Sequence, residues 1–323
     1  MKKPKEIKNT VIPYSRWVLI TGCGGMLGNA VYPLFTERYE HVLATDKILT
    51  EPWLEVFDVR DDARFAELMR DGKYDLVLHL AAETDVEVCE ADPDLSYAVN
   101  TRAARVLARI CAERGAALAF ISTAAVFDGK KDAPFIEDDT PSPIMAYGHH
   151  KLEGEHYVRS ICPEYYIFRA GWMMGGGVKH DKKFVHKIAK QVLAGATVIH
   201  AVTDKKGTPG YTYDFAKSMH NVISSGKCNT YHQVCRGTAT RYDVAKEILK
   251  VINRPDIELI EVNSDFFKEE YFAPRPPSEM MINENLNRID LNIMRTWQAS
   301  LKEYVHNHFP HLIRGGAAAA SGA

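Results

Sequence analysis

WVLITGCGGMLG, residues 17–28, joins a short apolar run to a loop that carries four glycines. The run has the length and composition of a strand buried on both faces of a parallel sheet. Apolar residues then recur at helical spacing over residues 27–34, so a helix should follow the loop. Glycines in such a turn let the backbone approach a pyrophosphate, whose charge rests at the helix N-terminus. The segment therefore predicts a dinucleotide site formed by Gly22, Gly25 and Gly28.

The same alternation of strand and helix continues outward from this segment. Apolar runs of strand length alternate with helical stretches at least five times along residues 16–170. Asp61 can cap one of these helices, and Pro93 suits the first turn of another. By the crossover rule, residues 16–170 should form an α/β dinucleotide-binding domain, a Rossmann-type doubly wound parallel sheet with helices on both faces. Further strands are expected at residues 41–46, 54–59, 74–82, 117–123 and 165–171.

The pattern is looser after residue 170, which predicts a smaller C-terminal α/β substrate domain over residues 171–313. A helix is expected at residues 183–194, and a last helix begins near Trp297. The helix expected at residues 213–224 should pack back on the first domain. The two ends lie outside the predicted fold, as a flexible leader at residues 1–15 and a disordered tail at residues 314–323.

Composition and charge exclude several classes of function. The formal net charge is −2, and no polybasic block indicates a nucleic-acid partner. No apolar run approaches the length that spans a bilayer, so no membrane contact is expected. The six cysteines form no C-x-x-C pair and none lies beside a histidine at metal spacing, so no metal site is expected. Scattered thiols of this kind are typical of a reducing, cytoplasmic compartment.

Residues at the ends of two predicted strands indicate how the dinucleotide is selected. Asp46 ends the second strand, where a carboxylate accepts hydrogen bonds from the adenosine ribose and repels a 2′-phosphate. This favours NAD(H), while NADP(H) stays open because Lys47 can offset the repulsion. Asp58 and Val59 end the third strand, where they can face the adenine amino group and the adenine ring. The apolar neighbours also expected on the cofactor side are Met26, Leu27 and Leu80.

YGHHK, residues 147–151, places a tyrosine and a lysine four residues apart, so both project from one face of a helix. A nearby ammonium favours phenolate, and Lys151 should therefore lower the pKa of Tyr147. A tyrosine tuned in this way can give a proton to a carbonyl oxygen as hydride arrives. The lysine can also hold the nicotinamide ribose. One turn of an ordinary surface helix is the competing interpretation.

Thr123 favours the functional interpretation. It ends the predicted strand at residues 117–123, where its hydroxyl can hydrogen-bond the same carbonyl oxygen. The Y-x-x-x-K spacing alone occurs often by chance, but here it follows a glycine-loop sheet and this strand end. Thr123, Tyr147 and Lys151 are therefore the candidate catalytic residues.

These motifs together resemble the extended short-chain dehydrogenase/reductases, and more closely the dTDP-4-dehydrorhamnose reductase (RmlD-like) branch. The matching segments follow the family's order over nearly all of residues 17–305. They are TGCGGMLG, HLAAETDVEVCEADPDLSYAVNT, ISTAAVFDG, YGHHKLEGE, FRAGWMMGGG, KKGTPGYTYDFA, APRPPSEMMI and TWQASLKEY. The match is more specific for the family than for the substrate.

The resemblance implies roles that the motifs alone do not give. It implies cofactor contacts for Ala81, Ala82 and Asn100. It places Thr84, Val86 and Trp172 at the sugar pocket, although Trp172 also suits a core position. It places Arg275 near the nucleotide diphosphate, where a guanidinium fork suits phosphate oxygens. It also makes a homodimer a candidate assembly.

The chain departs from the family pattern in its substrate lining. Ala124 and Ala125 stand where the family has an aspartate and a tyrosine, and the family tyrosine faces the sugar. Their small size should enlarge or reshape the sugar pocket. Met174 replaces a second family tyrosine, and Gly210 stands where a threonine is usual. The predicted proton-transfer residues are kept while the substrate lining differs.

The resemblance implies NAD(P)H-dependent reduction of a nucleotide-linked 4-keto-6-deoxy sugar. An epimerase of the same superfamily, which recycles bound NAD, is an alternative. Dehydration is disfavoured, because dehydratases usually carry acidic residues at the positions of Ala124 and Ala125. A third alternative is a nucleotide-binding regulatory subunit without turnover, resembling that of methionine adenosyltransferase.

Overall fold

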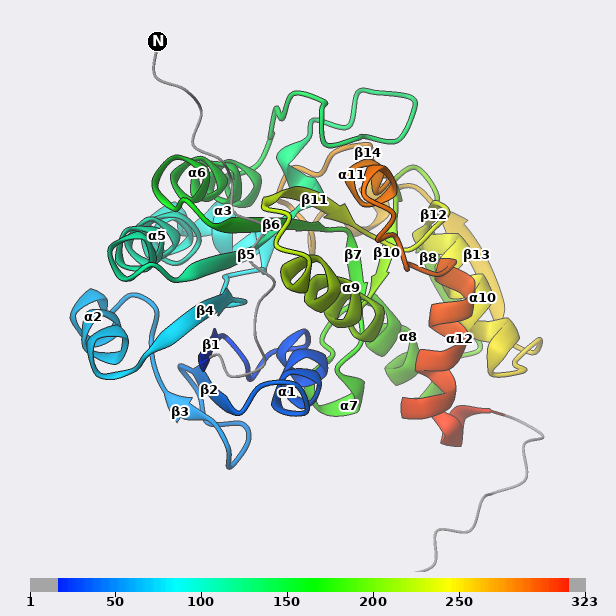
Figure 1. Cartoon of the computed structure of the whole chain (residues 1–323). Coiled ribbons are helices and arrows are strands. Elements are labelled where there is room, and N and C mark those ends of the chain that lie inside the picture. Colours follow the sequence, from blue (N-terminus) through cyan, green and yellow to red (C-terminus); the bar gives the residue numbers. More distant parts are fainter. Residues whose placement is uncertain (1–16, 314–323) are drawn as a thin grey trace, which may run out of the picture.

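A seven-stranded, wholly parallel sheet organises the first half of the chain (Figure 1). The computed structural model describes residues 17–313, so the predicted leader and tail lie outside the described residues. The strand order is β11-β6-β5-β4-β1-β2-β3. The strands are β1 (Trp17–Thr21), β2 (His41–Asp46), β3 (Glu55–Val56), β4 (Tyr74–His79), β5 (Ala117–Thr123), β6 (Tyr165–Ala170) and β11 (Asn229–Gln233).

The sheet is covered on both faces, which confirms the predicted doubly wound fold. Val18 and Ile20 of β1 face the core under α1 (Gly28–Thr36) and α9 (Thr212–Ser224). Leu19, one residue out of phase, faces the opposite core. Helices α2 (Asp62–Asp71), α5 (Ala103–Arg114) and α6 (Ala146–Ile161) cover that second face. The strand order reverses between β1 and β4, and their carboxyl ends open the crevice in which such sheets bind ligands.

Several element boundaries differ from the sequence prediction. β3 spans two residues rather than 54–59, because it is an edge strand and its Glu55 and Val56 are exposed. The long helix expected after Pro93 is divided into α4 (Pro93–Tyr97), a π-helical turn (Ala98–Arg102) and α5. A short helix, α3 (Val86–Ala91), was not predicted. The predicted Asp61 cap is confirmed, since its carboxylate accepts a hydrogen bond from the Arg64 N–H at 2.9 Å.

The second half of the chain forms a smaller lobe with its own apolar core. Its strands pair as β7 (Trp172–Met174) with β10 (Pro209–Tyr211), and β8 (Val198–Val202) with β13 (Glu258–Val262). A third small sheet places β9 (Lys206–Gly207) between β12 (Ala239–Thr240) and β14 (Ser278–Glu279). Its helices are α7 (Gly177–His180), α8 (Phe184–Leu193), α10 (Arg241–Val251) and α12 (Trp297–His308). Helix α11 (Glu284–Arg288) instead packs on β11, and its Leu286 belongs to the core of the first lobe.

Helix α9 lies in the second half of the sequence but belongs to the core of the first lobe. Its Phe215, Met219 and Ile223 are fully buried in the same cluster as Val31 and Phe35 of α1. Both helices lie on one face of the large sheet (Figure 1). The chain therefore returns to complete the first lobe after it has begun the second.

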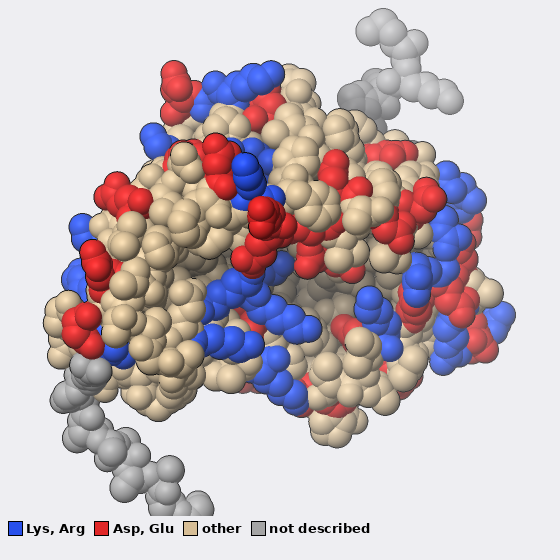
Figure 2. Space-filling model, turned by 180° about the vertical axis from the view of Figure 1, so that it is seen from behind, with Lys and Arg blue, Asp and Glu red and all other residues tan. Residues whose placement is uncertain are grey.

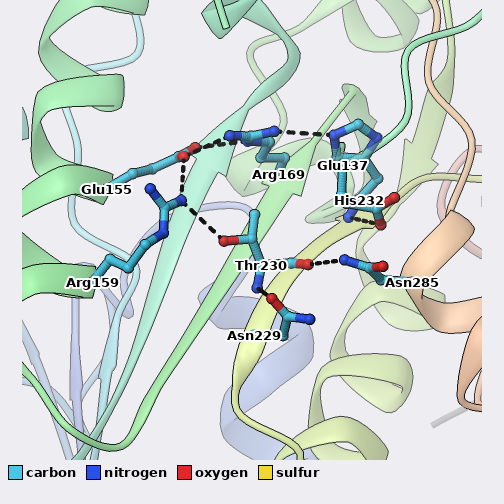
Figure 3. Close-up of polar contacts among 8 residues, drawn as sticks. All are labelled: Glu137, Glu155, Arg159, Arg169, Asn229, Thr230, His232 and Asn285. Atoms are coloured by element: carbon cyan, nitrogen blue, oxygen red, sulfur yellow. Dashed lines mark hydrogen bonds and ion pairs between the residues drawn. The ribbon is translucent and has the colours of Figure 1, made fainter. Parts of the chain in front are cut away.

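A buried polar network fastens the edge strand β11 to α6 (Figure 3). The Glu155 carboxylate accepts hydrogen bonds from Arg169 Nε at 2.9 Å and Nη2 at 2.7 Å, and both side chains are nearly inaccessible. Arg159 reaches both Glu155 and the Thr230 hydroxyl. The network lines an open polar pocket of about 450 Å³ at this edge of the sheet. Because a buried ion pair requires satisfied partners, this network fixes where α6 lies against the sheet.

Candidate active site

Three glycines of the first loop have different surroundings. A Cβ on Gly22, whose φ is +71°, would lie 2.4 Å from the Ala81 Cα. A Cβ on Gly28 would lie 2.0 Å from the Cys23 carbonyl oxygen. Around Gly25 the nearest atom is the Gly22 carbonyl oxygen, 3.5 Å away, so the space beside it is open. Two glycines thus permit close packing, and the third leaves room at the N-terminus of α1 for a pyrophosphate.

Asp46 lies against the glycine loop. Its Oδ2 accepts a hydrogen bond from the Gly24 N–H at 3.0 Å, and its Oδ1 accepts one from the Ile48 N–H at 3.2 Å. The carboxylate is therefore oriented at the end of β2, beside the loop. Lys47 is exposed next to it. The residues fit an adenosine ribose at this place, because a fixed acceptor meets an open glycine turn.

The second lobe contacts the glycine loop through α7. His180 Nδ1 lies 3.0 Å from the Gly24 carbonyl oxygen, and its Nε2 lies 3.1 Å from Glu51 Oε1. Lys179 donates to the same Glu51 oxygen at 2.6 Å and to the Thr50 carbonyl at 2.8 Å. These contacts were not predicted, since a lone histidine in a glycine-rich stretch gives no signal of its partner. They tie the cofactor-side loops to the other lobe.

Other cofactor-side residues have varied surroundings. Leu80 donates its N–H to the Thr21 carbonyl at 3.0 Å, and Ala81 and Ala82 follow it, partly exposed, beside Gly22. Met26 lies under the turn that enters α7, and Leu27 packs on the sheet core. Asp58 is paired with Arg60, whose guanidinium lowers the pKa of that carboxyl, and Val59 is buried beside Phe65. The predicted adenine contacts of Asp58 and Val59 stay predictions.

The Tyr147 phenol lies close enough to the Thr123 side chain for the two to interact. The Thr123 hydroxyl accepts a hydrogen bond from the Ala125 N–H at 3.2 Å, which fixes the turn after β5. Burial raises the pKa of Tyr147 above its usual range, and the nearby Thr123 opposes that shift. The two hydroxyls therefore meet at the carboxyl end of β5, as the sequence predicted, with the phenol protonated at neutral pH.

Lys151 lies behind Tyr147 in an aromatic setting. It is 1% exposed, and its ammonium lies 4.0 Å from the centroid of the Phe120 ring. Burial lowers the pKa of Lys151 to about 7, and the Glu155 carboxylate opposes that shift. The sequence argument expected Lys151 to lower the pKa of Tyr147. Instead burial dominates at Tyr147 and raises its pKa.

Two buried polar residues border Lys151. His79 Nδ1 lies 2.8 Å from the Thr21 hydroxyl, and burial lowers the pKa of His79 to about 3, so the imidazole is neutral. Asn100 lies on the π-helical turn and donates to the Glu83 carbonyl at 3.0 Å. The Asn100 Oδ1 is buried without a partner among residues 17–313. Such an orphaned acceptor points to a further ligand or water at this place.

The predicted sugar-side residues are engaged by charged groups. Thr84 accepts a hydrogen bond from Lys183 Nζ at its hydroxyl, 3.2 Å away. Trp172 donates its indole N–H to Glu279 Oε2 at 2.7 Å. Val86 begins α3, partly exposed, and Arg275 pairs with Glu87 of that helix at 2.7 Å. Lys183 and Glu279 were missed, because each contacts a residue about a hundred positions away in sequence.

The family departures lie in buried positions. Ala124 is 1% exposed and packs in a small cluster with Phe127 and Phe135. Ala125 is 3% exposed, and its carbonyl oxygen would lie 2.2 Å from a Cβ on Gly148. Met174 packs in the core of the second lobe. Gly210 is buried beside Met173. The predicted larger sugar pocket at Ala124 and Ala125 stays a prediction.

One face of the molecule is hollowed near its middle, with Lys and Arg side chains along one rim and Asp and Glu along another (Figure 2).

None of the helices within residues 17–313 has the length and apolar character needed to cross a bilayer. Within the same residues, no group of three or more His, Cys, Asp or Glu side chains is placed to hold a metal ion.

Comparison with known proteins gives consistent relatives. The model of the family described as RmlD substrate binding domain matches residues 16–309. The probable low-salt glycan biosynthesis reductase of Haloferax volcanii is 34% identical over 251 residues, covering 76% of this chain and 83% of that protein. The dTDP-4-dehydrorhamnose reductase of Mycolicibacterium smegmatis is 30% identical, covering 89% and 84%. Methionine adenosyltransferase 2 subunit beta of Xenopus laevis is 26% identical, covering 92% and 89%.

Solved structures agree with this assignment. A dTDP-4-dehydrorhamnose reductase from Yersinia enterocolitica aligns with a TM-score of 0.83 and 33% identity, covering 91% of this chain and 100% of that one. The protein of the same name from Bacillus anthracis, in complex with NADP, aligns with a TM-score of 0.83 and 26% identity, covering 91% and 99%. The family resemblance inferred from the motifs is confirmed. The chain belongs to the RmlD substrate-binding-domain family, within the extended short-chain dehydrogenase/reductases.

Proposed function

We propose that the protein is a reductase that transfers hydride from a nicotinamide cofactor to the keto group of a nucleotide-linked 4-keto-6-deoxy sugar. The observation that carries the proposal is the placement of Thr123 at the end of β5 close to Tyr147 of α6, with the buried Lys151 ammonium one turn further along the same helix. This arrangement lies at the carboxyl end of the sheet that bears the open glycine loop. Relatives named dTDP-4-dehydrorhamnose reductase, 29–30% identical over 89% of the chain, support the substrate class.

The chain's own residues provide proton transfer and orientation. When bound, the nicotinamide supplies the hydride. Tyr147 keeps its proton at neutral pH, because burial raises its pKa, and gives that proton to the substrate's carbonyl oxygen. Thr123 orients the phenol and offers a second hydroxyl to the same oxygen. Lys151, when charged, would hold the nicotinamide ribose and stabilise the phenolate that remains.

The cofactor is a nicotinamide dinucleotide, and we favour NAD(H) over NADP(H). The support is Asp46, whose carboxylate is held beside the open glycine turn by the Gly24 and Ile48 N–H groups. A 2′-phosphate at this place would meet that negative charge. Lys47 and Lys179, both exposed nearby in the chain's cofactor-side loops, oppose the preference. Residues 16–170 would bind this cofactor, and residues 171–313 would hold most of the sugar nucleotide.

Two alternatives have specific support. Epimerisation by transient oxidation would use the same Tyr147 and Lys151. Regulation without turnover is favoured by the 26% identity to the methionine adenosyltransferase subunit. Nothing in the Thr123–Tyr147 geometry distinguishes these from reduction, so turnover must decide.

The test is a reductase assay with dTDP-4-keto-6-deoxyglucose, its 3,5-epimer dTDP-4-dehydrorhamnose, and NADH or NADPH. Loss of absorbance at the reduced nicotinamide band, with one equivalent of reduced sugar nucleotide, supports the proposal. Interconversion of the sugars with no net consumption of NADH would identify an epimerase. Tight binding of nucleotide with neither reaction would favour the regulatory alternative.

A further inference from the structure

Arg241 is held flat against the sugar-side tryptophan. It is the first residue of α10, after the Thr240 cap, and its guanidinium carbon lies 3.8 Å from the centroid of the Trp172 ring. The Phe184 ring lies 5.1 Å away. Trp172 itself is oriented by the 2.7 Å hydrogen bond to Glu279 and by the close Gly207 backbone, where any Cβ would lie 2.3 Å from the indole. The stack therefore fixes the direction of the guanidinium.

The guanidinium of Arg241 has unused hydrogen-bonding capacity. It carries five N–H donors, yet none of residues 17–313 accepts a hydrogen bond or forms an ion pair with it. Neighbouring cations differ: Arg275 pairs with Glu87, and Lys183 donates to Thr84. Arg241 is partly buried and remains a cation at neutral pH. A partly buried cation whose donors bind no group of the described residues can offer them to an acceptor from outside the chain.

Arg241 belongs to the same cleft as the catalytic residues. The Glu279 carboxylate lies near enough to act electrostatically on both Arg241 and Tyr147. Glu279 is also the acceptor of the Trp172 indole. Lys183, which feels the charge of Arg241, contacts Thr84 at the predicted sugar pocket. A group bound by Arg241 would therefore belong to a ligand that also reaches Tyr147.

The stack changes what Trp172 can offer a substrate. One face of the indole is covered by the guanidinium, so that face cannot stack on a sugar ring. A planar cation with outward N–H groups recognises carboxylate or phosphate oxygens in pairs. We propose that Arg241, seated on Trp172, is a specificity residue that binds an anionic group of the substrate.

The anion has two sources in a sugar nucleotide: the diphosphate, or a carboxylate on the glycosyl unit. The proposal rests on the proposed sugar-nucleotide site, but it needs only binding, not reduction. Its failure is therefore distinguishable from failure of the reductase assignment. A protein that binds the anion through Arg241 but reduces nothing would refute the reductase and keep this inference.

The experiment compares the unaltered chain with Arg241→Met, which keeps an apolar stem on Trp172 and removes the charge. Calorimetric titrations use dTDP, thymidine, UDP-glucose and UDP-glucuronate. If the diphosphate is bound, affinity for dTDP falls roughly 10- to 100-fold while that for thymidine is unchanged. If a carboxylate is bound, only the affinity for UDP-glucuronate falls. Lys246→Met, an exposed change of the same charge on the same helix, is the matched control.

Two outcomes overturn the proposal. Arg241→Met could bind every probe as the unaltered chain does, which would leave the cation without a ligand role. It could also lose affinity for charged and uncharged probes equally, with a lowered melting temperature, which would indicate packing on Trp172 alone. Arg241→Lys provides a further check, because a lysine keeps the charge but cannot form the paired contact. It should recover only part of the lost affinity.

Discussion

The Lys151 ammonium rests on the face of the Phe120 ring, 4.0 Å from its centroid. The Lys151 cation is thus stabilised by an aromatic quadrupole, and the Glu155 carboxylate of the same helix also acts on it. This setting explains why the pKa of Lys151 falls to about 7, because an aromatic ring stabilises the charged ammonium less than water does. Small changes of pH or ligand can then switch its charge.

Lys151→Met should stabilise the fold most at low pH. The pKa of Lys151 is about 7 in the fold and near its ordinary value of 10.5 when unfolded. Below pH 7 both states carry the charge, and the fold bears the full cost of burying it. Between pH 7 and 10.5 the fold binds fewer protons, so that cost shrinks as pH rises. Urea unfolding at pH 6, 8 and 9.5 should show a gain for Lys151→Met that declines with pH. A gain that is constant with pH would contradict the lowered pKa.

Tyr147→Phe should remove turnover while leaving nucleotide binding nearly unchanged. The variant keeps the ring in its pocket and deletes the transferable proton, so kcat should fall by ~10²–10⁴-fold. Thr123→Val should lower kcat by a smaller factor, because it removes the hydroxyl near the phenol but leaves the phenol's proton. Steady-state kinetics with the sugar nucleotide measure both. Near-full activity of Tyr147→Phe would end the proposed mechanism.

Gly25→Val should abolish cofactor binding in a folded protein. A Cβ at Gly25 meets no protein atom closer than 3.5 Å, so the added side chain occupies the space where a pyrophosphate would bind. Gly28→Ala is the contrast, since its Cβ would lie 2.0 Å from a backbone oxygen and should lower the melting temperature. NADH fluorescence titration and thermal unfolding separate the two effects. Unchanged NADH affinity in Gly25→Val would refute the site.

Asp46→Ala should reduce the preference for NADH over NADPH. The substitution removes the charge that opposes a 2′-phosphate. It also removes the acceptor of the Gly24 N–H, so affinity for both cofactors should fall somewhat. The informative quantity is the ratio of the two dissociation constants. If the unaltered protein binds NADPH as tightly as NADH, then neighbouring lysines outweigh Asp46 and the NAD(H) assignment is wrong.

Glu155→Gln should destabilise the fold strongly. The change leaves the buried Arg169 guanidinium uncompensated, and breaking such a pair costs about 3–5 kcal/mol in the free energy of unfolding. Arg288→Gln is the control, because its pair with Asp138 is 46% and 60% exposed and should contribute less than about 1 kcal/mol. Denaturant unfolding of both variants measures the difference. Equal losses would show that the network in Figure 3 is not the main link between α6 and β11.

The fold, and the positions of Thr123, Tyr147 and Lys151 within it, could be predicted from sequence because their determinants are local. The strand, glycine loop and helix occupy a few consecutive turns, and the spacing of Tyr147 and Lys151 sets their common face. Thr123 needed only the prediction of a strand end. The π-helical break after Tyr97 was not predictable, since residues 98–102 have ordinary helical composition. At this turn Thr101 donates to the His150 carbonyl of α6, a tertiary contact that the local sequence does not show.

The substrate side was less accessible to sequence reasoning because its contacts are remote. Trp172 and Glu279 are 107 positions apart, and His180 and Gly24 are 156 apart. In the sequence, Arg241 is an ordinary charged residue at the start of a helix, with no sign of its contact to Trp172. The prediction that Lys151 lowers the pKa of Tyr147 was wrong for a related reason. Spacing shows that two side chains are neighbours, but the depth of burial decides their charges.

The late position of α9 in the chain has a consequence for synthesis on the ribosome. Six of the seven strands of the large sheet are made by residue 170, but α9 spans residues 212–224. Until α9 emerges, the sheet face that carries Phe168 and Leu78 lacks half of its cover. The nascent chain therefore exposes an aggregation-prone apolar surface while some forty further residues are translated. At ordinary elongation rates this takes roughly 2–10 s. During that interval we expect a ribosome-associated chaperone to bind the exposed sheet face.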